Sequence, residues 1–136
     1  MLFTTKTEYG MRAMVELAKN ADKDHPLPVS QIAKDQHLSQ AYLERLFAKL
    51  KADGLVKSTK GSGGGYYLSK KPKDINIFEI IEALDGPLMV FSCISQDENK
   101  LACSTKDCLT RQVWHELQKQ IIHTLRKFSL KDLVQK

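Results

Sequence analysis

Residues 60–68 read Lys60-Gly61-Ser62-Gly63-Gly64-Gly65-Tyr66-Tyr67-Leu68. The glycine run in this stretch lies between two short apolar segments. Glycine and serine at this density favour a tight turn, and the flanking segments 55–58 and 66–69 are rich in the residue types of strands. The stretch therefore predicts a β-hairpin with a basic, glycine-rich tip. It is not a phosphate-binding loop, because no Gly-Lys-Ser/Thr triplet follows the run.

Two short helices are predicted immediately before this hairpin. Ser30 is suited to cap one that runs to about residue 34, with Ile32 and Ala33 facing inward. Ser39 is suited to cap a second that runs to about residue 53, where Gly54 supplies the left-handed residue that ends it. Its buried stripe is expected to be Leu43, Leu46, Phe47 and Leu50. Helix, turn, helix and basic hairpin is the layout of a winged-helix DNA-binding domain.

The remaining elements are helical. Apolar periodicity predicts helices over residues 6–20, 75–84 and 109–128, whereas residues 88–107 show no period and are expected to form a loop. The last helix is long for a chain of 136 residues, and we interpret it as a dimerisation helix; the alternative is ordinary packing on its own domain. Its apolar stripe consists of Val113, Trp114, Leu117, Ile121, Leu125 and Phe128.

The predicted fold class is thus mainly α: a winged helix-turn-helix with a small hairpin wing and a long C-terminal dimerisation helix. Residues 1–86 form the DNA-binding part, residues 87–108 a cysteine-bearing loop, and residues 109–136 the dimerisation helix and C-terminal segment. Together they make one compact domain per subunit.

Positive charge is concentrated in the N-terminal half. Residues 1–75 hold 13 Lys/Arg against 8 Asp/Glu, whereas residues 76–136 hold 8 of each. Between Arg45 and Lys73 there are eight cations and a single acid, Asp53. Such a patch favours a polyanion, because each phosphate it neutralises releases counterions. A solvated basic face without a partner is the alternative.

Three side chains lie on the exposed N-terminal part of the second helix: Tyr42, Glu44 and Arg45. A helix of this length fits the major groove, where each base pair presents a distinct pattern of donors and acceptors. A carboxylate is repelled by phosphate, so we interpret Glu44 as an acceptor from a cytosine amino group. An intrahelical salt bridge with Arg45 or Lys51 is the alternative.

The wing is expected to contact the sugar-phosphate backbone. Glycines at 61, 63 and 64 permit close backbone approach, and Lys60 is placed to contact phosphate or enter the minor groove.

The N-terminus lacks the apolar run of a secretory signal and no stretch is long enough to span a membrane, so we expect a cytoplasmic protein with no membrane partner. Cys93, Cys103 and Cys108 are an odd number of thiols, and their spacing fits no zinc finger. Three thiolates of this kind are suited to an iron-sulfur cluster that needs one further ligand. Buried or incidental cysteines are the alternative.

Five segments resemble the family of IscR-like iron-sulfur cluster regulators, which also includes the nitric-oxide-sensing and cysteine-metabolism regulators NsrR and CymR. The resemblance covers nearly the whole chain. The segments are Thr4-Thr5-Lys6 with Tyr9, Ala41 to Phe47, the Gly-Ser-Gly-Gly-Gly-Tyr wing, Cys108-Leu109-Thr110 before Trp114, and Leu130 to Val134.

The resemblance implies a homodimeric bacterial transcription regulator that binds a pseudo-palindromic operator in double-stranded DNA. It implies that a cluster on the three cysteines, 2Fe-2S in preference to 4Fe-4S, changes which operators are bound. It also implies DNA contacts by Ser39, Tyr42, Lys60 and Ser62, and site discrimination by Glu44.

The sequence departs from this pattern at the cluster. The first two cysteines are farther apart than in the family, and Arg111 replaces the histidine expected three residues after the last cysteine. Arginine stays protonated and does not ligate iron. His115 lies about 10 Å along a helix from Cys108, which is far for one small cluster. By resemblance Glu8, reaching across from the partner subunit, is the better candidate for the fourth ligand; an ordinary surface acid is the alternative.

Two other functions compete. One is a cofactor-free winged-helix repressor controlled by thiol oxidation or a protein partner. The other is a cysteine enzyme or a protein-interaction module, and no Cys-His pairing supports the enzyme. We therefore expect a protein that is not an enzyme.

Overall fold

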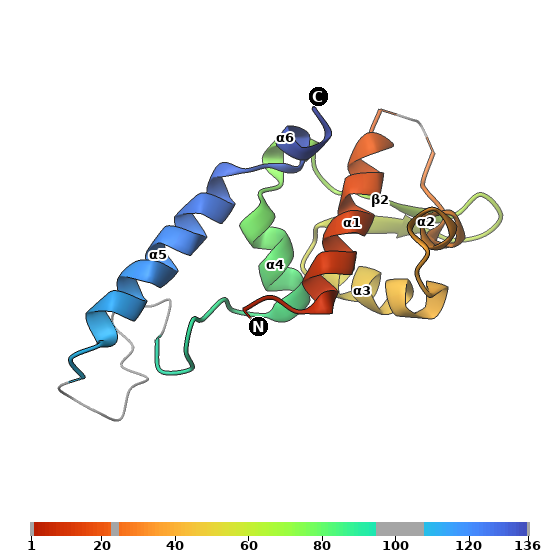
Figure 1. The fold of residues 1–136 in the computed structure, drawn as a ribbon. Helices are drawn as coiled ribbons and strands as arrows, with labels where there is room; N and C mark the ends of the chain where they lie inside the picture. The colour runs from red at the N-terminus through yellow and green to blue at the C-terminus, as the bar shows by residue number, and fades with distance from the viewer. Residues whose placement is uncertain (1, 23–24, 95–107, 136) are drawn as a thin grey trace.

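The computed structural model describes residues 2–22, 25–94 and 108–135. Three helices and a hairpin form a winged-helix unit, a fourth helix packs beside it, and a long helix extends along the opposite side (Figure 1). In chain order the elements are α1 (Thr5–Lys19), α2 (Val29–Gln36), α3 (Gln40–Ala52), β1 (Val56–Thr59), β2 (Gly65–Leu68), the 3-10 turn η1 (Pro72–Asp74), α4 (Ile77–Asp85), α5 (Arg111–Lys127) and α6 (Leu130–Val134). The predicted mainly α winged-helix class is confirmed.

Helix caps explain most of the boundaries. The Ser39 hydroxyl accepts a hydrogen bond from the Tyr42 backbone N–H at 3.3 Å and begins α3, as predicted. Gly54 follows the helix with φ +76°, a conformation that suits glycine. The prediction that Ser30 caps α2 is wrong: the helix begins at Val29 after Pro28 and has no side-chain cap.

The hairpin is antiparallel, with Val56 opposite Leu68 and Thr59 opposite Gly65. Leu27 adds to it, because its N–H donates to the Tyr66 carbonyl at 2.9 Å and its carbonyl accepts from the Tyr66 N–H at 3.0 Å. The segment before α2 thus fixes the base of the wing to the helix-turn-helix.

The core lies between α1, α3 and α4. All four residues of the predicted α3 stripe are buried, and α4 contributes Ile77, Phe78, Ile80, Ile81 and Leu84. Helix α6 closes the core with Leu130, which has no exposed surface. It begins with a capping box in which Ser129 and Asp132 bond reciprocally, and the Leu130 N–H donates to the Ile75 carbonyl at 3.0 Å.

Helix α5 stands at one edge of the molecule, on the far side of α4 and α1 from the hairpin (Figure 1). The residues of its predicted apolar stripe differ in exposure. Trp114, Ile121 and Leu125 are half-buried, whereas Val113, Leu117 and Phe128 are 60%, 44% and 50% exposed. In α5 the one buried side chain is a polar one, Gln118. No helix in the described residues is long and apolar enough to cross a membrane.

Candidate DNA-binding surface and cysteine segment

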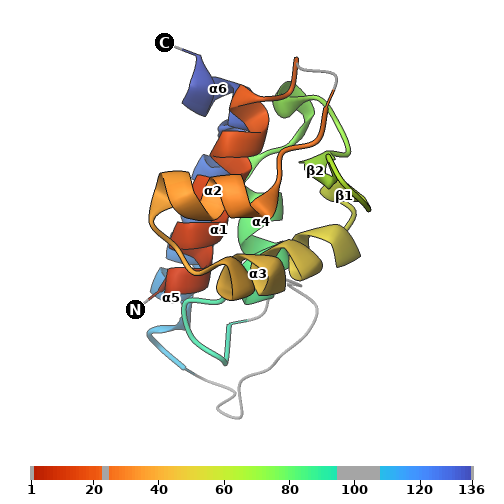
Figure 2. The same ribbon diagram turned by 90° about the vertical axis from the view of Figure 1, so that its right-hand side faces the viewer.

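The helix-turn-helix and the hairpin share one face of the molecule, with α5 behind them (Figure 2). The turn between α2 and α3 contains a residue that sequence reasoning missed: His37 is left-handed, with φ +55°. Its side chain is exposed. The Leu38 N–H donates to the Ala33 carbonyl at 2.9 Å and completes this turn.

A polar network fixes α2 to α1. The Arg12 guanidinium donates through Nε to the Gln36 side-chain oxygen at 2.9 Å and through a terminal nitrogen to the Gln36 carbonyl at 3.0 Å. The Gln36 amide in turn donates to Glu16 at 2.9 Å. These bonds hold the end of α2, and through it the angle between α2 and α3, which determines how α3 is presented.

Glu44 and Arg45 project from α3 into solvent, as predicted. Within the part of the chain that the structure describes, Glu44 makes no ion pair. Lys51, one of the partners considered for it, donates to the Ser58 hydroxyl at 2.7 Å instead. The salt-bridge alternative for Glu44 therefore loses its support.

Tyr42 is half-buried rather than fully exposed, and its ring meets that of Tyr9 edge-on with centroids 6.0 Å apart. Tyr66 stacks on Phe47 with centroids 4.4 Å apart. Burial, and secondarily the negative charge of Glu44, raise the pKa of Tyr66, so its hydroxyl stays protonated. Glu44 is therefore electrostatically coupled to the wing.

The conformation of the turn itself requires glycine at several positions of the wing. Gly61 and Gly63 have φ of +95° and +82°, and a Cβ on Gly64 would lie 2.5 Å from the Thr59 carbonyl oxygen. Lys60 and Ser62 are exposed at this tip. Their contact with DNA, together with that of the glycines, stays a prediction.

Three lysines of the basic patch make contacts within the protein, and one of these contacts is an ion pair. Lys49 donates to the Leu84 carbonyl at 3.3 Å, Lys51 is held by Ser58, and Lys70 pairs with Glu79 at 3.5 Å. Lys71 and Lys73 line a separate groove, described below. Arg45, Lys57 and Lys60 are exposed and make no ion pair with a described residue.

The segment that carries Cys93 is attached to α5. The Val90 N–H donates to the Gln118 side-chain oxygen at 2.9 Å, and the rings of Phe91 and Trp114 meet edge-on with centroids 5.1 Å apart. Cys108 lies just before α5, so these contacts bring the segment of Cys93 to the same end of the helix (Figure 1). Both thiols are free and half-buried.

The surroundings of Cys108 lower the pKa of its thiol. The Thr110 hydroxyl lies 3.3 Å from its sulfur, and this hydrogen bond is the main reason that the pKa of the Cys108 thiol is lowered. The backbone N–H groups of Thr110 and Arg111 and the positive charge of Arg111 act in the same direction.

The other proposed ligands are not gathered into a site. Cys103 lies outside the described residues, and among those that are described no three His, Cys, Asp or Glu side chains converge as a metal site. Glu8 is exposed in the first turn of α1. His115 is half-buried on α5.

The geometry defines a winged-helix DNA-binding protein with cysteines at the base of a long, partly unpartnered helix. Residues 3–136 match the Rrf2 family, whose description is "Iron-dependent Transcriptional regulator". The chain belongs to this family, and its members that match here are transcription regulators and not enzymes.

Related proteins and solved structures support this family assignment. The chain is 36% identical to the transcriptional regulator IscR of Klebsiella pneumoniae over 98% of this chain and 80% of that protein. CymR (YrzC), the global cysteine regulator of B. subtilis, superimposes with a TM-score of 0.79 at 33% identity, covering 97% of this chain and 95% of CymR. IscR of T. potens gives a TM-score of 0.77 at 34% identity, covering 96% and 84%. The resemblance to IscR-like regulators is thereby confirmed.

Proposed function

We propose that this transcription regulator binds its operator under the control of an iron-sulfur cluster held by Cys93, Cys103 and Cys108. The observation that carries the proposal is the arrangement at the start of α5. There Val90 and Phe91 contact Gln118 and Trp114, and Cys93 follows two residues later, which supports a site between this segment and Cys108 just before the helix. The lowered pKa of Cys108 favours the thiolate, which is the form that ligates iron.

The donor set fits a cluster of this kind. Three thiolates supply soft ligands, and Arg111, beside Cys108, contributes positive charge but no ligand. We assign the fourth position to Glu8 of the partner subunit, since this carboxylate is exposed and available for a contact between subunits. A bound cluster, of the 2Fe-2S type in preference to 4Fe-4S, would supply sensitivity to oxygen, nitric oxide or iron supply.

DNA recognition is assigned to α3 and the wing. Glu44 and Arg45 meet base edges in the major groove, and Ser39 and Tyr42 contact the backbone at the start of the helix. At the wing tip Lys60 and Ser62 contact phosphate, with the backbone of Gly61, Gly63 and Gly64 close to the sugar-phosphate wall.

The exposed face of α5 supports a homodimer. Val113 and Leu117, one turn apart in α5, are 60% and 44% exposed, and Leu109, in the turn just before the helix, is 95% exposed. Apolar side chains at this spacing form a continuous stripe, which a second copy of the helix covers. A two-fold dimer presents two copies of α3 to a pseudo-palindromic operator, in the cytoplasm where bacterial DNA lies.

The test is to purify the protein without air, record its native mass, and titrate operator DNA before and after iron is removed. We expect a dimer that carries iron and sulfide, and an operator affinity that changes when the cluster is lost. The matched control is Cys108→Ser, which should keep the dimer and lose the iron. A dimer without iron under these conditions would refute cluster control and leave DNA binding intact.

One specific observation favours a second candidate, a cofactor-free repressor controlled by thiol oxidation. The thiol of Cys108 is half-buried and free, and its lowered pKa raises its reactivity toward oxidants. The fold is as similar to CymR as to IscR. If no iron copurifies and mild peroxide alters operator affinity in the wild type but not in Cys108→Ser, this second function holds.

A further inference from the structure

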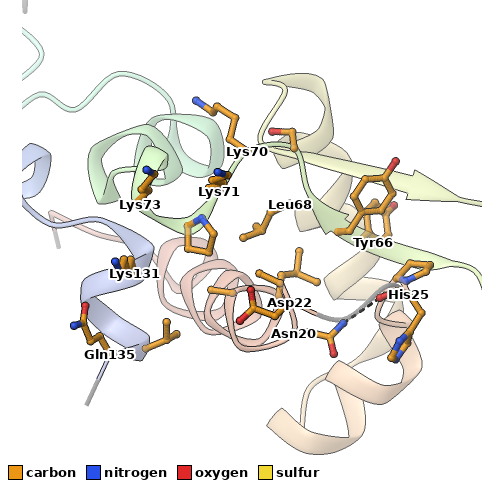
Figure 3. A pocket seen from close by; sticks show the side chains of 18 of the residues that line it. Asn20, Asp22, His25, Tyr66, Leu68, Lys70, Lys71, Lys73, Lys131 and Gln135 are labelled. Carbon is orange, nitrogen blue, oxygen red and sulfur yellow. Dashed lines mark hydrogen bonds between the residues drawn. The ribbon is translucent and has the colours of Figure 1, made fainter.

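A groove of about 1130 Å³ lies between the end of α1, the strands of the hairpin, η1 and α6 (Figure 3). It is separate from the cysteine segment and from α3, and it borders the wing at Thr59 and Tyr67. Its floor is apolar: Leu17 and Ala18 are buried there, and Leu68 and Val134 are half-buried. Its rim carries lysines from three different elements, Lys70 and Lys71 after β2, Lys73 in η1, and Lys131 in α6. Segments more than a hundred residues apart in the sequence thus form one surface.

Few acidic groups in the described residues balance the charge of these lysines. Lys70 pairs with Glu79 at 3.5 Å, but within the described ranges Lys71, Lys73 and Lys131 make no ion pair. The one carboxylate among the described lining residues is Asp22. Concentrated positive charge over a concave apolar floor raises the local concentration of anions that also carry apolar groups.

The position of the groove argues against a role in DNA binding. Helices α6 and α3 lie at opposite ends of α1, so the groove lysines in η1 and α6 are on the side of the molecule away from α3, although the groove reaches the wing strands (Figure 1). A DNA duplex is a stiff convex rod, and it presents phosphates but no apolar side chains that would fill the floor. An extended or helical peptide fits a recess of this shape and places both kinds of side chain at once.

We propose that this groove binds an acidic, amphipathic segment of a partner protein. Carboxylates of the segment pair with Lys71, Lys73 and Lys131, and its apolar side chains pack on Leu68 and Val134. The polar rim and apolar floor correspond to the anatomy of a peptide-binding interface. The site is independent of the cysteine ligands and of the α3 contacts, so the regulator gains an input besides its proposed cluster.

The probe for this proposal is a short fluorescein-labelled peptide of glutamate, leucine and alanine with its leucines on one helical face. The matched peptide has lysine in place of each glutamate. Anisotropy should show saturable binding of the acidic peptide to the dimer and none of the basic one. We expect the double variant Lys71→Glu/Lys131→Glu to weaken binding at least about tenfold, and Lys127→Glu, an exposed lysine of α5 outside the groove, to change it less than about twofold.

A second variant changes the shape of the groove without changing its charge. Ala21 is exposed and lines the recess, so Ala21→Trp fills it without removing a lysine. Weaker peptide binding by this variant, with an unchanged thermal midpoint and unchanged operator affinity, supports a docking groove. The proposal is overturned if Lys71→Glu/Lys131→Glu leaves peptide affinity unchanged or if Ala21→Trp has no effect. It is also overturned if the lysine double variant weakens operator DNA as much as peptide, since the lysines would then be phosphate contacts.

Discussion

Replacing Asp85 by asparagine should loosen the start of α1 from the end of α4. The carboxylate accepts hydrogen bonds from the hydroxyls of Thr4 and Thr7, both at 2.5 Å, and from the Thr4 N–H at 3.3 Å. Thr4 is the N-cap of α1, so the negative charge also lies at the positive end of that helix. Asp85 is the last residue of α4 and precedes the segment that leads to Cys93.

The magnitude follows from these contacts. Asparagine keeps one acceptor oxygen but replaces the other with an NH₂ group, so it cannot accept from all three donors and it loses the charge. A hydrogen bond to a charged group contributes about 1.5–3 kcal/mol when well shielded; with the partial exposure of Asp85 we expect a loss of about 1–2 kcal/mol. For a domain of this size that is a fall of about 3–6 °C in the thermal midpoint.

The effect should depend on pH in a definite direction. Burial alone would raise the pKa of Asp85, but the hydrogen bonds from Thr4 and Thr7, with a contribution from Lys6, lower it on balance. A folded-state pKa below that of the unfolded chain means that the carboxylate stabilises the folded protein above about pH 4. That stability is lost as the pH falls through the depressed folded pKa.

Urea unfolding of wild type and Asp85→Asn, followed by circular dichroism at fixed protein concentration, measures this difference. The two proteins should differ most at neutral pH and converge as the pH is lowered below 4. Asp74→Asn is the matched control, because Asp74 is an exposed acid in η1 whose carboxylate has no hydrogen bond to a described residue. An equal loss in the control, or a difference that persists undiminished in acid, would refute the assignment to the Thr4–Thr7–Asp85 network.

Three further results are expected. Glu44→Gln should reduce discrimination between operator variants by about tenfold or more per contacted base, with little loss of total affinity; mobility-shift titrations with single-base operator variants measure this, and unaltered discrimination would exclude base contact by Glu44. Val113→Glu with Leu117→Glu should yield monomers by sedimentation, since both side chains lie on the exposed face of α5, and an unchanged dimer would place the interface elsewhere. Gln118→Leu should cost about 1–3 kcal/mol in urea unfolding because it leaves the Val90 N–H without its acceptor, and a neutral result would contradict that role.

The DNA-binding part was predictable from sequence because its determinants are local. Ser39 caps its own helix, Gly54 ends it, and the apolar spacing selects the buried stripe of α3. Each of these depends on residues within one or two turns. The start of helix α2 is the exception: its N-cap is Pro28, which has no side chain that could accept a hydrogen bond, so the nearby Ser30 gives a misleading cap signal.

Other features depend on contacts between distant segments. The Asp85 network spans 81 residues, and Gln118 is buried because its amide oxygen meets the Val90 backbone. The spacing of apolar residues does not predict that a polar residue such as Gln118 is buried on the inner face of α5. Helix α6 did have a local signal, Ser129 followed three residues later by Asp132, but at five residues it is too short for a periodic pattern.

The arrangement constrains how the proposed cluster could act on DNA. The cysteine segment is attached to the start of α5, whereas α2, α3 and the hairpin lie on the far side of α1 and α4 (Figures 1 and 2). In the proposed dimer, α5 has two faces: Trp114 and Gln118 hold its own cysteine segment, and Val113 and Leu117 face the second copy. A change at the thiols would therefore reach the operator by rotating one subunit against the other. For dimeric helix-turn-helix proteins, whose half-sites are spaced by about one helical turn, roughly 34 Å, such a rotation would bring the two recognition helices into or out of register.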